Sequence, residues 1–465
     1  MSLFRQRTAG GAGIPTPASP PNQGGALLVR NEPAVAAVST RSSSSLDDLK
    51  WWILERIEAD WDRNVLPTRN DESQAFVGRM FDQLLAESGS VLSAADHQKL
   101  QKAIEDETIG YGPIEELLRD ETCTEIMVNG PDLTYAERKG KLIETDIKFR
   151  DDEHVMKVIN RILAPLGRRV DRKWPMVDAR LPDGSRVNAI IPPCALNGPT
   201  ITIRKFSSKP LQVADLIRFG SLTEQLAKFL EACVVGRLNI VVAGGTGSGK
   251  TTLLNVLSSF IPDDERIVTI EDAAEIQLMQ RHVVTLEAKP ADPDGSGRVT
   301  IRDLVINSLR MRPERIVIGE CRGGEALDML QAMNTGHDGS LTTTHANTPR
   351  DTIARLETLS MMSGMDLPIN VLRAQIASAI HLIVQQARLK DGSRKVTYVT
   401  EVQGMEGDTV VLQDVFKFVE HGVDPTTGKV IGQMVATGIR PKFMEDLQNH
   451  GIFIDASVFD PGRPF

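Results

Sequence analysis

The chain has 465 residues and a formal net charge of −9, with 53 Lys and Arg against 62 Asp and Glu. This length accommodates several domains of ~100–200 residues each, and 41% hydrophobic residues exclude a wholly disordered chain. The net acidity disfavours a protein that coats nucleic acid, because phosphate backbones repel it. The four cysteines are dispersed without a CxxC pair, which argues against a disulfide framework or a cysteine zinc site and fits a reducing compartment.

No uninterrupted apolar run reaches the ~20 residues that span a bilayer. The best candidate, 371–387, is interrupted by Arg373 and His381. The N-terminus lacks the apolar segment of a signal peptide. We therefore expect a cytoplasmic protein that associates with a membrane only through partners.

The first 110 residues are predicted to form two different parts. Residues 1–45 contain five Pro, five Gly and a serine run, so they bury too little surface to offset the entropy of ordering, and we expect a disordered tail. This tail is net basic, with four arginines against one glutamate. Residues 46–110 carry apolar side chains at helical spacing, such as Trp52, Ile53 and Ile57, and predict a small helical module.

Residues 111–209 predict an α+β domain, and residues 210–221 a linker. A helix is expected at 155–166, and a hairpin at 180–191 is indicated by the Asp183–Gly184 turn. The remaining predicted strands are 125–129, 133–138, 141–147 and 200–206.

Residues 222–465 predict an α/β domain, because short apolar strands alternate with helices, as in a largely parallel sheet covered on both faces. Its predicted strands are 238–243, 267–270, 283–286, 315–319, 340–344 and 380–385. Its predicted helices are 251–260, 301–311, 325–334, 349–363 and 442–449. After residue 392 the strands are expected to be antiparallel.

The strongest motif begins at Gly244 and matches GxxxxGK[ST], directly after an apolar strand and before a helix. Its glycines let backbone N–H groups face phosphates, and the helix N-terminus favours negative charge. Lys250 is expected to reach the β/γ phosphates of ATP, and the Thr251 hydroxyl to bind Mg²⁺. The predicted nucleotide-binding residues are Gly245, Thr246, Gly247, Ser248, Gly249, Lys250, Thr251 and Thr252.

Two carboxylates follow predicted strands downstream of this loop. Glu320 ends the strand 315–319, and Glu271 ends the strand 267–270. Both are candidates for the catalytic base and for the Mg²⁺ ligand beside Thr251, and the sequence leaves their division of labour open.

Two histidines, His337 and His345, flank a polar strand. They are too widely spaced for a metal site, whereas a neutral histidine near the γ-phosphate can orient water. Arg180, Arg186 and Arg204 are candidates for neutralising the transferring phosphoryl group. An odd number of residues in the loop that joins Arg180 and Arg186 would place them on one face of the sheet, and an even number would separate them.

Several of these segments together resemble the type II/IV secretion ATPases, and most of all the CpaF-type ATPases of the tight-adherence (Flp) pilus. The segments are 110–115 (GYGPIE), 125–130 (EIMVNG), 176–188 (MVDARLPDGSRVN), 201–206 (ITIRKF), the P-loop, 269–272 (TIED), Gly319–Glu320, His337 to His345, and 436–443 (ATGIRPKF).

The resemblance implies a RecA-like P-loop domain, an N-terminal domain that covers the nucleotide, and a homo-hexamer. It implies ATP and Mg²⁺ as ligands, and catalytic roles for Glu271, Glu320 and His345. It also implies that Arg180, Arg186 and Arg204 approach the phosphates, in one version across the subunit boundary. The implied partners are platform proteins of the inner membrane, which would recruit the motor to the inner face of the cytoplasmic membrane.

Two other functions remain open from the sequence. A nucleotide-dependent switch or scaffold would bind ATP with little turnover, although Glu271, Glu320 and His345 argue for hydrolysis. A RecA-like nucleic-acid translocase is disfavoured by the acidic charge of the body of the chain, so no stable nucleic-acid binding is expected.

Overall fold

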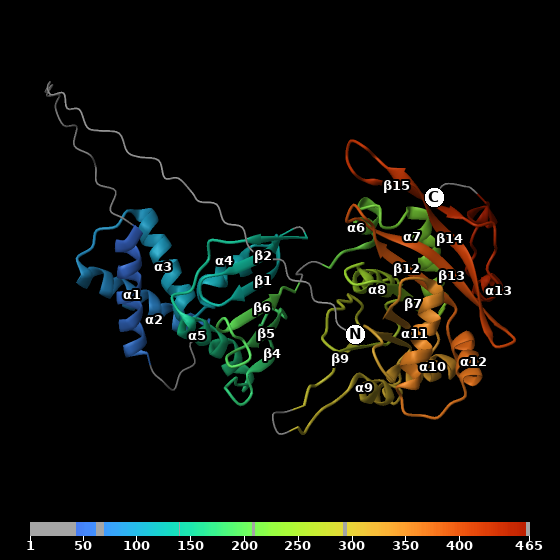
Figure 1. Ribbon diagram of the computed structural model, residues 1–465, viewed down its shortest axis with the longest axis horizontal. Helices are drawn as coiled ribbons and strands as arrows, with labels where there is room; N and C mark the ends of the chain where they lie inside the picture. Colours follow the sequence, from blue (N-terminus) through green and yellow to red (C-terminus); the bar gives the residue numbers. More distant parts are fainter. Residues whose placement is uncertain (1–42, 62–68, 139, 207–209, 292–294, 462–465) are drawn as a thin grey trace, which may run out of the picture. The chain divides into compact units, whose positions relative to one another are not determined.

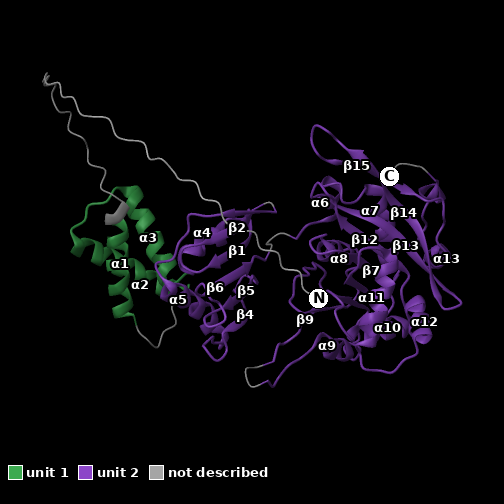
Figure 2. Ribbon diagram, in the orientation of Figure 1, with its two compact units in different colours: residues 1–110 green, residues 111–465 purple. Residues whose placement is uncertain are grey.

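The computed structural model describes residues 43–61, 69–138, 140–206, 210–291 and 295–461. The chain divides into two compact units after Gly110 (Figure 2). Residues 1–42 of the predicted tail lie outside the described residues. A helix begins at Ser43, within the last three residues assigned to that tail.

The described residues of the first unit form three helices, α1 (Ser43–Asp60), α2 (Asp71–Ser88) and α3 (Ala94–Thr108). Ile57, Phe81 and Ile104 are fully buried, and they belong to the one apolar cluster that joins these helices. The Ser93 side chain begins α3 by accepting a hydrogen bond from the backbone N–H of Asp96.

The second unit contains a six-stranded antiparallel sheet in the order β3-β2-β1-β6-β5-β4 (Figure 1). Its strands are β1 (Cys123–Asn129), β2 (Thr134–Arg138), β3 (Lys141–Glu144), β4 (Met176–Arg180), β5 (Arg186–Ile190) and β6 (Thr200–Arg204). Its helical segments are η1 (Gly112–Ile114), α4 (Glu115–Arg119), α5 (Asp152–Leu163) and η2 (Ala164–Leu166). The apolar side of α5, with Val155 and Ile159, shares one core cluster with Ile126 and Ile203 of the sheet.

The same unit contains a nine-stranded sheet in the order β15-β14-β13-β12-β7-β11-β10-β8-β9. Within the run β12-β7-β11-β10-β8-β9 each strand is parallel to the next one. At the other end of the sheet, β13, β14 and β15 are added by antiparallel pairing, β13 to β12, β14 to β13 and β15 to β14. The bounds are β7 (Ile240–Gly244), β8 (Ile267–Glu271), β9 (Val283–Glu287), β10 (Arg315–Ile318), β11 (Leu341–His345), β12 (Leu382–Arg388), β13 (Arg394–Glu406), β14 (Thr409–Val423) and β15 (Val430–Ala436).

Helices cover both faces of this larger sheet. Successive side chains of a strand point to opposite faces of the sheet. In β7, Ile240 and Val242 therefore belong to one apolar cluster, and Val241 and Ala243 belong to the other. The first cluster includes residues of α6 (Val213–Arg218), α7 (Glu224–Val235), α8 (Lys250–Ser258) and α13 (Met444–Asn449). The second includes residues of α9 (Ile301–Ser308), α10 (Glu325–Asn334), α11 (Pro349–Met361) and α12 (Ile369–Ala379). A last turn, η3 (Ala456–Phe459), packs in the first cluster through Phe459.

The predicted fold class is confirmed: a RecA-like α/β P-loop sheet is preceded by an α+β segment and a helical unit. Four α-helices among the described residues were not predicted: α4, α6, α7 and α12. The helix α6 lies within the segment expected to be a linker, and α12 overlaps the stretch considered as a membrane candidate. None of the helices in the described part of the chain combines the length and the apolarity that crossing a bilayer requires.

Candidate functional site

The site lies where the parallel strands end at one edge of the larger sheet. The register pairs Gly244 at the end of β7 with His345 at the end of β11 and with Gln386 near the end of β12. Glu320 follows β10, which lies beside β11. Ligands in open α/β sheets bind at the carboxyl ends of the strands, so we expect a ligand to bind at this edge.

The predicted P-loop connects β7 to α8. Gly247 has φ +70° and Gly249 has φ +93°, in the left-handed region that glycine adopts without steric cost. A Cβ on Gly244 would lie 2.4 Å from the carbonyl oxygen of Gln386, so no larger residue fits there. The sequence therefore needs glycine at these positions to turn the chain from the strand into the first turn of α8, which begins at Lys250.

Lys250 is buried at the base of this loop. Its Nζ donates a hydrogen bond to the Gly245 carbonyl at 3.1 Å and lies 3.3 Å from His345 Nε2. Burial lowers the pKa of Lys250, with the positive charge of Arg322 acting in the same direction and Glu320 opposing it. An anion beside the ammonium group would offset this cost of burial, as expected for a lysine that binds phosphate.

Glu320 and His345 form a pair next to Lys250. Glu320 Oε1 lies 2.8 Å from His345 Nε2, and its other oxygen accepts a hydrogen bond of 2.6 Å from Arg322 Nε. Burial lowers the pKa of His345, the charge of Lys250 lowers it further, and Glu320 opposes both. The imidazole is therefore neutral at neutral pH, the state predicted for a histidine that orients water beside a phosphate.

Glu271 is held in a different arrangement from Glu320. Its buried carboxylate accepts hydrogen bonds from the backbone N–H groups of Glu275 at 3.0 Å and Ile276 at 3.1 Å. Burial raises the pKa of Glu271 to about 7, and these backbone hydrogen bonds act in the opposite direction. A Cβ on Gly319 would lie 2.7 Å from Glu271 Cγ, so Gly319 leaves the space that this side chain fills. The hydrogen bonds of the Glu271 carboxylate thus lie within the loop that follows β8, and its catalytic role remains a prediction.

The three predicted arginines form a row across the smaller sheet. Arg180 of β4 pairs with Arg186 of β5, and Arg186 pairs with Arg204 of β6. Directly opposite residues of neighbouring strands point to the same face, so the three side chains share one face of the sheet. Like charges directly opposite one another are unfavourable, and each guanidinium here contacts a carboxylate. The pairs are Arg180–Glu287 at 2.5 Å, Arg186–Glu275 at 2.9 Å and Arg204–Glu125 at 2.9 Å.

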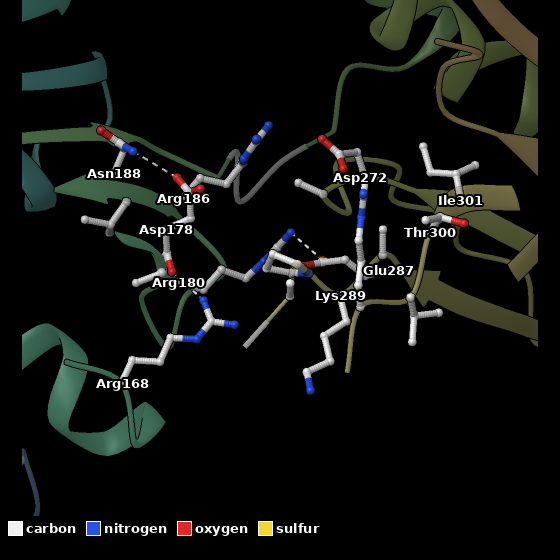
Figure 3. A pocket seen from close by; sticks show the side chains of 18 of the residues that line it. Arg168, Asp178, Arg180, Arg186, Asn188, Asp272, Glu287, Lys289, Thr300 and Ile301 are labelled. Carbon is white, nitrogen blue, oxygen red and sulfur yellow. Dashed lines mark hydrogen bonds and ion pairs between the residues drawn. The ribbon is translucent and has the colours of Figure 1, made fainter. Parts of the chain in front are cut away.

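These arginines line a cleft of about 1200 Å³ that includes none of the P-loop residues (Figure 3). In Figure 3, Arg180 and Glu287 approach each other from opposite sides of the cleft. Arg322 connects the cleft to the P-loop site, because it lines the cleft and contacts both Glu320 and Asp272. The structure thus brings Lys250, Glu320 and His345 together and leaves the arginine row on carboxylates.

The residues present fit a Mg²⁺ ion that is bound together with a nucleotide. Mg²⁺ is commonly held by one or two carboxylates and by phosphate oxygens instead of an all-protein cage. Among the described residues there is no group of three or more His, Cys, Asp or Glu that could hold a metal. The Thr251 hydroxyl in the first turn of α8 and the Glu320 carboxylate are the donors that this chemistry needs.

The sequence reasoning missed several residues at this edge. Arg322 could have been noticed because it follows Glu320 by two residues. No local sequence motif pointed to Arg388, the last residue of β12, or to Arg394, the first residue of β13. Arg394 Nε donates a hydrogen bond to the Gly247 carbonyl at 2.9 Å. His337 precedes β11, at the opposite edge of the sheet from His345, so the two histidines do not share the site.

Comparison with known proteins gives relatives that are named for conjugal transfer and for type IV secretion. A protein named putative conjugal transfer protein from Mycobacterium tuberculosis is 36% identical over 312 residues, which cover 66% of this chain and 88% of the relative. The type IV secretion system protein VirB11 of Bartonella henselae is 34% identical over 329 residues, covering 62% of this chain and 90% of VirB11.

Similar solved structures include the VirB11 ATPase of Brucella suis, which is 32% identical, covers 62% of this chain and 92% of that protein, and has a TM-score of 0.35. The sequence model of the family described as type II/IV secretion system protein matches residues 107–414. This match spans more than half of the chain and contains the P-loop, Glu320 and His345. The chain therefore belongs to the type II/IV secretion system protein family.

Proposed function

We propose that the chain is a Mg²⁺-dependent P-loop ATPase and the motor of a secretion or pilus machine. The observation that carries this proposal is the contact of Lys250 with the His345–Glu320 pair at the end of the P-loop. A protein that only binds a nucleotide does not need a half-buried carboxylate and a neutral imidazole beside its phosphate site. The match to the type II/IV secretion system protein family over residues 107–414 adds support.

In this proposal each residue has a defined task. The residues 245–252 cradle the phosphates, and Lys250 exchanges its contacts with Gly245 and His345 for phosphate oxygens. Glu320 accepts the proton of the attacking water, and the neutral His345 orients that water through its contact with Glu320. Bound Mg²⁺, on Thr251 and Glu320, would neutralise charge on the phosphoryl group. Glu271 is retained as the second acidic candidate for base or metal ligand.

We further propose that hydrolysis is coupled to domain motion in a homo-hexamer. The parts are a tail (1–45), a helical module (46–110), a covering domain (111–209), a linker (210–221) and the RecA-like domain (222–465). Arg180, Arg186 and Arg204 would leave their carboxylates for nucleotide phosphates, in one version those of a neighbouring subunit. The closure and reopening of the covering domain would transmit force.

The subtype that the sequence motifs support best is the CpaF-type motor of the tight-adherence pilus. We propose that this motor is cytoplasmic and that platform proteins recruit it to the inner face of the cytoplasmic membrane. The conjugal transfer and VirB11 names of the relatives place those proteins in related machines.

The experiment is to measure phosphate release by the purified full chain with ATP and Mg²⁺. We expect turnover in the wild type. Glu320→Gln should lower it by ~10²-fold or more while nucleotide binding persists, since a general base contributes about that much. Lys250→Ala should lose both binding and turnover. Glu406→Gln, at an exposed end of β13, is the matched control. Turnover of Glu320→Gln equal to that of the control would refute the assignment.

The same assay tests the switch or scaffold, and a DNA-binding titration tests the translocase. A switch or scaffold would bind ATP but release phosphate at a rate that Glu320→Gln does not change. A nucleic-acid translocase would bind DNA with an affinity that falls steeply with salt; we expect no such binding.

A further inference from the structure

Two arginines of one hairpin lie against the P-loop on the side of β12. This strand runs beside β7, with Gln386 opposite Gly244, so the hairpin that follows it extends past the loop. Arg388 and Arg394 are directly opposite each other across the two strands of this hairpin. Arg394 Nε holds the Gly247 carbonyl at 2.9 Å, and Arg388 Nη1 lies 3.8 Å from the position that a Cβ on Gly247 would occupy.

These guanidinium groups are not balanced by carboxylates. Among the residues that the structure describes, Arg388 has no ion pair or side-chain hydrogen bond, and Arg394 donates only to Gly247. The acid in the turn between them, Asp391, accepts hydrogen bonds from Ser393 and from the backbone N–H of Val430. Like charges opposite one another in a β-ladder are destabilising unless an anion lies between or beside them.

A buried amide of the same hairpin gives a second, independent indication of a ligand. Gln386 is 3% exposed, its Oε1 has no hydrogen-bond partner within the described part of the chain, and its Nε2 lies 3.4 Å from the position of a Cβ on Gly249. A buried polar atom without a partner is costly. Gln386, Arg388 and Arg394 thus supply polar groups in excess of what the protein itself satisfies, all beside the P-loop.

We propose that this hairpin is part of the nucleotide site, as a cationic clamp supplied by the same subunit that supplies the P-loop. Arg388 contacts the phosphate chain of the bound nucleotide. Arg394 is a positioning residue that keeps Gly247, and with it the backbone N–H groups of the loop, turned toward the phosphates. The inference rests on the proposed function, because it requires a nucleotide at the P-loop.

The test is fluorescence titration of the full chain with N-methylanthraniloyl derivatives of ATP, ADP and AMP in the presence of Mg²⁺. We expect Arg388→Ala to weaken ATP binding on the order of 10-fold, as for a lost charge-assisted hydrogen bond. The effect should be smaller for ADP, smallest for AMP, and reduced at high salt. Lys390→Ala removes a charge from the turn of the same hairpin and should bind like the wild type.

Arg394 is tested by conservative rescue. Arg394→Ala should weaken the binding of both ATP and ADP. Arg394→Lys should recover part of the lost affinity, because an ammonium group can also donate a hydrogen bond to the Gly247 carbonyl. Both variants should melt at the wild-type temperature, since the Arg394 side chain is exposed. Equal effects of lysine and alanine would overturn the positioning role.

The outcomes separate this inference from the proposed function. If the wild type binds no nucleotide, or if Lys250→Ala binds as well as the wild type, the proposed function and the clamp both fail. If Lys250→Ala loses binding while Arg388→Ala binds like Lys390→Ala, the P-loop site stands and the clamp is refuted.

Discussion

At the scale of single residues, the environment of each side chain decides its protonation and therefore its chemistry. Glu271 and Glu320 both follow parallel strands, yet one is buried against backbone N–H groups and the other contacts His345 and Arg322. Burial raises the pKa of Glu271 to about 7. The two acids are therefore not interchangeable, although the sequence presents them alike.

His381 gives a prediction about pH and stability. Its Nδ1 accepts the backbone N–H of Asn239 at 2.9 Å, and burial lowers the pKa of His381 below its ordinary 6.5 even though Asp338 and Asp446 oppose this. As pH falls through about 6.5, the unfolded chain binds a proton that the folded protein does not, so stability falls.

Urea unfolding at pH 7.5 and 5.5 would measure this effect against His381→Asn, whose amide oxygen can replace Nδ1 as the acceptor. We expect the wild type to lose more unfolding free energy between the two pH values than the variant does. Equal losses would show that His381 does not contribute to the pH dependence.

At the scale of elements, the chain segments that end strands and begin helices hold the site in place. Thr348 caps α11 three residues after His345, and its side chain accepts the backbone N–H of Asp351 at 3.1 Å. The cap, followed by Pro349 in the first turn, starts the helix a few residues after the end of β11.

Removing this cap should destabilise the first turn of α11. We expect Thr348→Ala to cost about 1 kcal/mol, seen as faster amide hydrogen exchange at residues 350–353. Thr348→Ser retains the hydroxyl and should exchange almost like the wild type. Unchanged protection in the alanine variant would mean that packing of Ile353 and Leu356, and not the cap, sets the stability of this turn.

At the scale of the whole molecule, the arginine row is the feature that assembly would change. Arg186 contacts Glu275 within the chain, so it must exchange this carboxylate for a phosphate if it acts in catalysis. If the arginines act across subunits, a hexamer would bring the arginine row of each subunit to the P-loop of its neighbour.

Mixing inactive variants tests this arrangement. Combined Arg186→Ala and Lys250→Ala subunits should recover part of the ATPase activity, because a subunit with an intact P-loop can then receive Arg186 from its neighbour. The control is a mixture of Lys250→Ala and Glu320→Gln, which damages two residues of one site and should remain inactive. No recovery in the first mixture would place Arg186 in its own subunit's site.

The sequence by itself determined the local features of this protein. The P-loop glycines, the alternation of strands and helices and the Asp183–Gly184 hairpin are short-range patterns, so backbone sterics and periodicity were enough to predict them. The helix α12 was not predicted from the sequence, because its apolar face is interrupted by polar residues and a buried strand follows it directly.

Only the tertiary structure decided which polar residues share a site. The contact of Lys250 with His345 depends on the register of β7 and β11, and the row from Arg180 to Arg204 depends on the register of β4, β5 and β6. Arg388 and Arg394 reach the loop only because β12 lies beside β7. These pairings join residues far apart in the chain, and strand order and register, which arise from packing of the whole sheet, have no signature in any single segment.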